Sequence, residues 1–330
     1  MSNPSLLSRV AESVYWLGRY IERAENVARF VDVNIHLSLD AADQHGEQWA
    51  PLIQVSGDEA EFRERYTDYT PENVIHFLTF DTANQNSILS CLMAARENAR
   101  TIRDTISSEM WEQVNRMYLD LREEVSRGRA IDSPGDLYHG IKQACHLFEG
   151  IAHSTMSHGE AWHFMTLGRS LERADKATRI LDVKYFYLLP SVAHVGTSVD
   201  DIQWAAVLKS VSGFEMYRKR YGRIVPEQIV EFLLLDRYFP RAVHFCLLRA
   251  VSSLHSITET PAGTFRNPAE RLLGQLRAEL DYTSVTEVIA EGLHEFLDSL
   301  QAKINAVDDA VFDTFFALRG FPVTSSAAAG

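Results

Sequence analysis

The sequence contains little cysteine: three residues among 330, namely Cys91, Cys145 and Cys246. Their wide spacing matches neither a disulfide framework nor a zinc-binding motif. Cys91 and Cys246 lie within apolar stretches, where a thiol behaves as a small hydrophobic side chain. We therefore expect buried cysteines that contribute to packing.

Basic residues are scarce relative to acidic ones. Lysine and arginine total 32 against 45 aspartates and glutamates, which gives a net charge of -13. Proteins that bind nucleic acids or anionic membranes in a general way gain affinity by neutralising phosphate groups. The charge balance therefore argues against both kinds of partner, although a local basic patch is compatible with it.

Long hydrophobic runs are absent. No stretch approaches the roughly 20 apolar residues that a membrane-spanning helix needs. Arg9 and Glu12 interrupt the apolar core that a signal peptide would require near the amino terminus. The sequence therefore predicts a cytoplasmic protein.

The patterns of several fold and enzyme classes are also missing. No segment shows sustained strand alternation, which favours an all-α fold. No glycine-rich phosphate loop, hydrolase serine elbow or Cys/His dyad is recognisable, and the histidines are scattered. No complete catalytic set is visible, and we expect no cofactor.

What the sequence does contain is an internal repeat. Residues 17–29 match residues 167–179 at seven of thirteen positions, and residues 71–78 match residues 226–233 in the same order along the chain. Helical patterning alone would match apolar positions, whereas here Gly, Arg, Glu and Pro match together. A repeat of this length is too long for a solenoid unit, so it indicates a duplicated helical domain.

The predicted architecture is all-α, with two tandem pseudo-symmetric helical-bundle repeats packed together. The first repeat covers residues 1–135 and the second covers residues 136–321. The boundary follows the turn signal Ser133-Pro134-Gly135. Residues 322–330 form a predicted disordered tail, because small and polar residues at a chain end rarely order.

Apolar periodicity and helix-start signals place the individual helices. Residues 81–85 should form a turn, after which Asn84 or Asn86 caps the next helix. Residues 45–71 are irregular apart from one short helix. The other predicted helices cover residues 7–35, 58–66, 71–80, 107–127, 137–154, 160–188, 202–221, 226–235, 240–257, 269–280 and 285–318.

The repeated motif borders the apolar stripe of its helix. At about 100° per residue, Gly18, Glu22, Glu25 and Arg29 share a stripe beside the core-facing positions. A glycine in mid-helix costs about 1 kcal/mol relative to alanine, so close approach of a partner would explain Gly18. Arg19 and Glu22 are spaced to pair within one helix, as are Arg169 and Glu172.

The two motif copies supply the main candidate site. If their helices pack face to face about a pseudo-twofold axis, several arginines and two glutamates converge. Such a centre is either a buried ion-pair network that fixes how the two halves dock, or a set of donors for an anionic ligand. The candidate residues are Arg19, Glu22, Arg23, Arg29, Arg169, Glu172, Arg173 and Arg179.

Four secondary candidates also follow from the repeat. Asp81 corresponds to Asp236, and Asn86 corresponds to Arg241. An aspartate between two helices is typically a cap or turn residue, and we favour that role here.

A metal site is the weakest alternative. Glu160-x-x-His163 and Glu291-x-x-His294 have the spacing of helical di-iron bundles, which Glu22 and Glu172 would have to complete. Each Glu-x-x-His occurs in only one repeat, and arginines flank the motif glutamates. Repulsion between these cations and a metal ion would weaken the site, so we predict no bound metal.

The stretch from Ser8 to Asn26 resembles the opening of the bacterial Alpha-E family, as do residues 86–88, 95–100 and 239–243. The resemblance covers nearly the whole chain. It implies an all-helical domain with a Glu-Arg motif that often occurs in tandem. It also implies, by gene context, ATP-grasp carboxylate–amine ligases, transglutaminase-like proteins and a proteasome-like hydrolase as neighbours, in a system that makes or modifies peptides.

Two functions are consistent with the sequence and this resemblance. In the first, the protein is a non-catalytic partner of an ATP-grasp ligase and holds the enzyme or the growing peptide. In the second, the Glu-Arg centre itself performs catalysis or binds a peptide or amino-acid carboxylate. We favour the first, since no complete catalytic set is visible. A sealed centre with every arginine paired would indicate architecture, and an open cleft would indicate a ligand.

Overall fold

The computed structural model describes residues 6–40, 49–127, 134–186 and 198–317, and every regular element within them is helical. The elements are α1 (Ser8–Asp40), α2 (Ala50–Ser56), α3 (Glu59–Arg65), α4 (Pro71–Thr79), α5 (Ile88–Thr101), α6 (Ser108–Arg127), α7 (Pro134–Thr155), α8 (Glu160–Phe186), α9 (Ser198–Ser210), α10 (Phe214–Tyr221), α11 (Pro226–Leu234), α12 (Val243–Thr258), α13 (Pro268–Tyr282), α14 (Val285–Glu291), α15 (Leu293–Val311) and the π-helical turn η2 (Phe312–Phe316). The predicted all-α class is confirmed. None of these described helices has the length and apolar character to cross a membrane.

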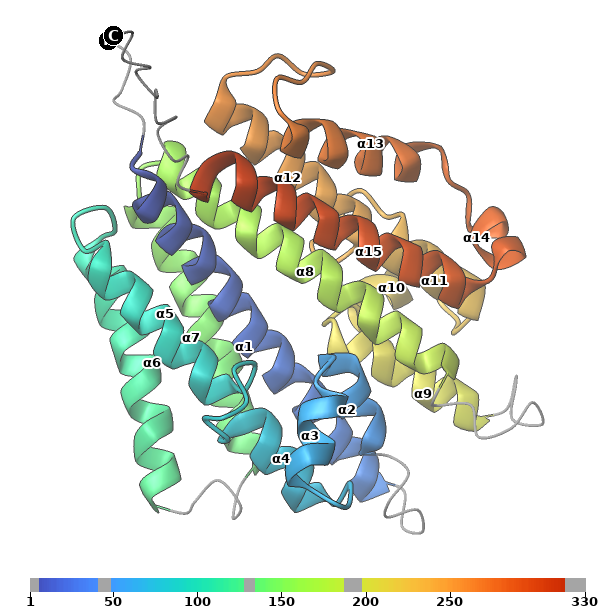
Figure 1. The fold of residues 1–330 in the computed structure, drawn as a ribbon. Coiled ribbons are helices and arrows are strands. Elements are labelled where there is room, and N and C mark those ends of the chain that lie inside the picture. Colours follow the sequence, from blue (N-terminus) through green and yellow to red (C-terminus); the bar gives the residue numbers. More distant parts are fainter. Residues whose placement is uncertain (1–5, 41–48, 128–133, 187–197, 318–330) are drawn as a thin grey trace, which may run out of the picture.

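Two long helices, α1 and α8, pack against each other in the middle of the molecule (Figure 1). Helices α5 and α7 pack on α1, and α6 closes that group. Helices α12 and α15 pack on α8, and α13 closes the second group. Two short helices also contact the central helix of the opposite group: α2 lies against α8, and α9 lies against α1.

The apolar stripe predicted for α1 forms the centre of the core. Val14, Leu17, Ala24 and Val31 are each fully buried. The burial of this stripe ends at the amino terminus of the helix, where Leu7 is 74% exposed. Helix α1 therefore buries its apolar face along most of its length, and its motif residues are carried into the interior beside that face.

Glycines set how closely α1 and α8 approach. A Cβ atom added to Gly18 would lie 2.4 Å from the backbone oxygen of Met165, and one added to Gly168 would lie 2.4 Å from that of Tyr15. The close approach predicted from Gly18 is confirmed, and α8 is the partner. The contact is reciprocal, since each motif glycine meets the backbone three residues ahead of the other.

Two predicted helices are each interrupted. The helix expected over 202–221 breaks because Ser212 adopts a left-handed conformation (φ 51), and the amide of Gly213 donates to the Leu208 carbonyl at 2.7 Å in a Schellman motif. The helix expected over 285–318 breaks at Gly292, whose φ is 109.

Other expectations need smaller corrections. Residues 50–56, expected to be irregular, form α2 with a proline in its first turn. The cap of α5 is Ser87, whose Oγ accepts from the Ser90 amide at 3.2 Å, rather than Asn84 or Asn86. Helix α7 begins at Pro134, inside the predicted turn Ser133-Pro134-Gly135. Ser133 and the predicted tail, residues 322–330, lie outside the described residues.

The glycine contact yields a stability prediction. Gly18→Ala and Gly168→Ala should each destabilise the protein by about 1–3 kcal/mol, because the added methyl group meets a backbone oxygen that cannot rotate away. Gly150→Ala is the matched control: it lies in mid-helix α7, and a Cβ there meets nothing within 4 Å. Urea unfolding curves measure all three. A Gly18→Ala variant as stable as the control would contradict this packing.

Candidate functional site

The two motif glutamates are held by arginines of the opposite helix. Arg23 donates to Glu172 through Nε at 2.7 Å and Nη2 at 2.9 Å. Arg173 donates to Glu22 through Nε at 2.9 Å and Nη2 at 2.6 Å. Each pair is a two-pronged guanidinium–carboxylate contact, the strongest geometry available to these groups.

The pairing predicted within each helix is wrong. Arg19 does not pair with Glu22 but donates from Nε to Glu172 at 2.9 Å, and Arg169 instead pairs with Glu149 of α7 at 2.8 Å. Because the glycine contact brings α1 and α8 so close, Glu172 of the other helix lies within reach of Arg19. Glu22 and Glu172 are each 1% exposed, so the centre lies inside the interface.

One secondary candidate from each half also reaches the centre. Arg241, which precedes α12, donates from Nη1 to Glu22 at 2.9 Å and to Asn26 at 3.1 Å. Asn86, which precedes α5, accepts from Arg23 at 2.6 Å and donates to Asp58 at 2.7 Å. The turns ahead of α5 and α12 therefore complete the network.

The two candidate aspartates lie outside it and act as turn residues, as the sequence indicated. Asp81 Oδ1 accepts from the Ala83 amide at 2.9 Å. Asp236 Oδ1 accepts from the amides of Tyr238 at 2.7 Å and Phe239 at 2.6 Å.

The outer arginines of the motif hold the two short helices α2 and α9. Arg29 donates to Glu25 at 2.6 Å and to the hydroxyl of Ser212, the residue that ends α9. Arg179 pairs with Asp175 at 2.9 Å and lies beside Gly57, the residue that ends α2. Each guanidinium group thus stands near a helix carboxyl terminus, where the helix dipole favours positive charge.

Sequence reasoning missed several members of the network. Glu25 and Asp175 carried a signal, because both copies of the motif have an acidic residue there. Asp308 of α15 pairs with Arg19 and accepts from the Tyr15 hydroxyl, yet nothing in the repeat marks it. The other missed members are Trp16, Asn26, Asp58, His146, Glu149 and Lys176.

The arginines keep the buried carboxylates ionised. Burial alone would raise the pKa of Glu22, but the guanidinium groups of Arg173 and Arg241 outweigh it and hold that pKa below its usual range. The pKa of Glu172 is likewise lowered, with Arg23 and Arg19 outweighing burial. A carboxylate with a depressed pKa and no access to solvent cannot exchange protons as a general acid or base near neutral pH.

The cysteines offer no nucleophile. All three are buried, as expected from their apolar surroundings. Burial raises the pKa of the Cys91 and Cys246 thiols to about 12 and also raises that of Cys145. Since the thiolate is the reactive form, these groups remain protonated packing residues at neutral pH.

The metal alternative does not fit the donors. Glu22 and Glu172 are occupied by guanidinium groups, Glu160 accepts from the Leu6 amide at 2.9 Å, and His294 lies 2.7 Å from Asp182. Across residues 6–40, 49–127, 134–186 and 198–317, no three or more His, Cys, Asp or Glu side chains gather as a metal site would require. The arrangement can hold helices together, but it does not present a ligand set.

The chain is similar to one protein family and to uncharacterized mycobacterial proteins. A family described as a predicted alpha-helical domain with a conserved ER motif matches residues 6–316. The uncharacterized proteins Mb2597 of Mycobacterium bovis and Rv2567 of Mycobacterium tuberculosis are each 23% identical over 339 residues, covering 94% of this chain. The chain spans 37% of the length of these relatives. No solved structure matches it significantly.

The buried glutamates yield a mutational prediction. Glu22→Gln and Glu172→Gln each remove one negative charge from a poorly solvated network and leave its guanidinium groups with less counter-charge. We expect a loss of about 3–5 kcal/mol in the free energy of unfolding. Glu97→Gln is the control, because Glu97 pairs with Arg96 and Arg100 at the surface, where such pairs contribute about 0–1 kcal/mol. Equal unfolding midpoints for Glu22→Gln and the control would refute the structural role.

Acid should destabilise the protein through the same groups. Because the pKa values of Glu22, Glu25 and Glu172 are lower in the folded than in the unfolded state, the unfolded chain binds more protons as the pH falls. Stability should be full above about pH 5 and decline progressively below the unfolded glutamate pKa of about 4.3. Urea unfolding at pH 7, 5, 4 and 3 measures the decline. It should be shallower in Glu172→Gln, and an unchanged slope would contradict the assignment.

Proposed function

Because the chain belongs to the Alpha-E family, we propose that it is a non-catalytic helical partner of an ATP-grasp carboxylate–amine ligase, in a system that makes or modifies peptides. In this setting we expect it in the cytoplasm, with transglutaminase-like proteins as further partners. The net charge of -13 favours protein or peptide partners over nucleic acid or anionic membranes.

The sealed Glu-Arg centre is the observation that carries this proposal. Glu22 and Glu172 are each 1% exposed, and the arginines of both motif copies all have carboxylate partners. A substrate carboxylate could enter only by displacing one of these glutamates from its guanidinium groups. Burial disfavours that exchange, so the centre suits an architectural role better than catalysis or carboxylate binding.

We also propose that the halves 1–135 and 136–321 are tandem repeats related by a pseudo-twofold axis between α1 and α8. Three reciprocal features support this relation. Gly18 and Gly168 each meet the other helix's backbone, and Arg23 and Arg173 each hold the other helix's glutamate. Helix α5 of the first half packs on α1 much as α12 of the second half packs on α8.

The length of the relatives supports action beside another polypeptide. In the mycobacterial proteins, the stretch similar to this chain makes up 37% of the sequence, so it accompanies a larger part. We propose that this bundle likewise works beside a ligase. A rigid bundle fixed by buried ion pairs suits such a role, because a docked enzyme needs a surface that keeps its shape.

An assay of ATP-dependent ligation tests the proposal. The cognate ATP-grasp protein is given each amino acid in turn, with and without this chain, and peptide mass and ADP release are measured. We expect more ligation in the presence of the chain, and no ATP turnover by the chain alone. Ligation that is indifferent to the chain, with no complex in size-exclusion chromatography, would reject the partnership.

The same assay separates the two roles of the centre. If Glu22 is architectural, Glu22→Gln should lower the unfolding midpoint, and stimulation should fall only with the folded fraction. Unchanged unfolding together with lost stimulation would instead support a catalytic or binding role.

A further inference from the structure

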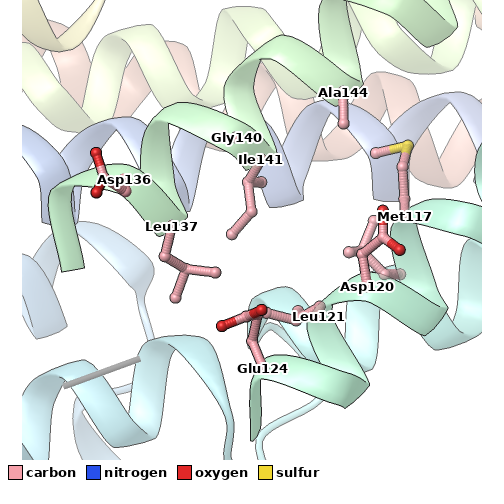
Figure 2. A pocket seen from close by; sticks show the side chains of 10 residues that line it. Met117, Asp120, Leu121, Glu124, Asp136, Leu137, Gly140, Ile141 and Ala144 are labelled. Carbon is pink, nitrogen blue, oxygen red and sulfur yellow. The ribbon is translucent and has the colours of Figure 1, made fainter. Parts of the chain in front are cut away.

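A cavity lies between α5, α6 and α7. None of its lining residues belongs to the Glu-Arg centre. Its volume is about 640 Å³, within the range of small-molecule sites. Its walls carry the apolar side chains of Leu92, Met117, Leu121, Leu137 and Ile141. In Figure 2, Leu137 and Ile141 point from α7 into the space that Leu121 faces from α6.

The charge around this apolar space has one sign. Asp120, Glu124 and Asp136 line the cavity, and among the residues that the structure describes no lysine, arginine or histidine lines it. Within the described part of the chain, the side chains of Asp120 and Asp136 make no ion pair or hydrogen bond, whereas Glu124 does have a partner. Asp120 and Asp136 are therefore the two carboxylates available to a ligand.

A second hollow continues the cavity along α6 and α7. Its volume is about 390 Å³, and it shares Met117, Asp120 and Ala144 with the first cavity. Arg116 also lines this second hollow, so positive charge is present there but not in the described lining of the first cavity. Leu147 extends the apolar surface at its far end and is 52% exposed. A ligand in the cavity can thus be the end of a longer molecule that lies along the two helices.

Gly140 leaves the cavity open. It lies within α7, where glycine costs about 1 kcal/mol relative to alanine. A Cβ at this position would meet nothing within 4 Å, so no steric contact requires glycine there. A larger side chain at Gly140 would project into space that is now empty.

We propose that this cavity binds an aliphatic primary ammonium group, with its apolar body among the leucine, isoleucine and methionine side chains and its charge at Asp120 and Asp136. The acidic rim selects a cation, and no basic residue in the described lining of the first cavity offers a counter-charge to a ligand carboxylate held there. The favoured ligand class is therefore an apolar amine or the amino terminus of an apolar peptide, rather than a free zwitterionic amino acid. If the proposed function holds, this is a site for the amine that the ligase joins.

Calorimetric titration of the full chain tests the charge and the source of the amine. Hexylamine should bind, hexanol should bind more weakly, and hexanoate should not bind. Leucinamide should bind more tightly than leucine if the cavity accepts a peptide amino terminus, and hexylamine should exceed leucinamide if it accepts a side-chain-like amine. Equal binding of hexylamine, hexanol and hexanoate would overturn the proposal.

Variants locate the site. Asp120→Asn and Asp136→Asn should each weaken hexylamine binding about twofold to fivefold, the range for exposed ion pairs. Gly140→Leu should abolish binding by filling the cavity. Glu109→Gln, on the same helix as Asp120, and Gly150→Leu, on the same helix as Gly140, are matched controls outside the cavity lining.

The outcome is independent of the ligase assay. Hexylamine binding that survives Gly140→Leu would place the amine elsewhere and reject the site. Binding lost in Gly140→Leu, with ligation indifferent to the chain, would keep the site and reject the partnership. Stimulated ligation without amine binding would reject the site and keep the partnership.

Discussion

Two carboxylates buried between α1 and α8 place a strict constraint on this fold. Removing a carboxylate from water costs several kcal/mol, which is offset only if guanidinium groups meet it in good geometry. Glu22 and Glu172 meet that condition across the helix interface, not within a helix. Sliding α8 along α1 by one turn would separate Glu22 from Arg173 and Glu172 from Arg23 in a dry place. The glycine contact fixes the distance between the helices, and the crossed ion pairs fix their register.

Much of this centre followed from the sequence, because the repeat and the stripe geometry depend on local rules. Glu22 borders the apolar face, so its burial was predictable, and Gly18 pointed to a close neighbour. The partner of Arg19 was not predictable in the same way. Helix spacing alone would pair Arg19 with Glu22. Because α8 approaches the backbone at Gly18, Arg19 instead donates to Glu172 at 2.9 Å. Tertiary contact overrode a local preference of only a few tenths of a kcal/mol.

The missed end of α9 has the same origin. Residues 202–221 and 285–318 continue a helical pattern across their breaks, and neither contains proline at the break. Ser212 ends α9 in a conformation that serine rarely adopts, and its hydroxyl receives Arg29 from α1. The break is therefore part of a contact with a helix about 180 residues away in sequence. No local signal encodes such a contact, just as none marks Asp308 as a partner of Arg19.

The two halves reach the same electrostatic result with different residues. Glu22 is held by Arg173 and Arg241, and Glu172 is held by Arg23 and Arg19. Asn86 stands where the second half has Arg241, so the first half lacks that cation, and Arg19 of the motif takes its place. Arg169, the counterpart of Arg19, is thereby released to Glu149.

Physical chemistry requires that each buried carboxylate be matched by guanidinium donors, but it does not require that the donors be equivalent. A centre balanced in this way leaves no donor for a substrate. The proposed recognition site therefore lies on the outer helices, where the cavity between α5, α6 and α7 has apolar walls and the carboxylates of Asp120 and Asp136.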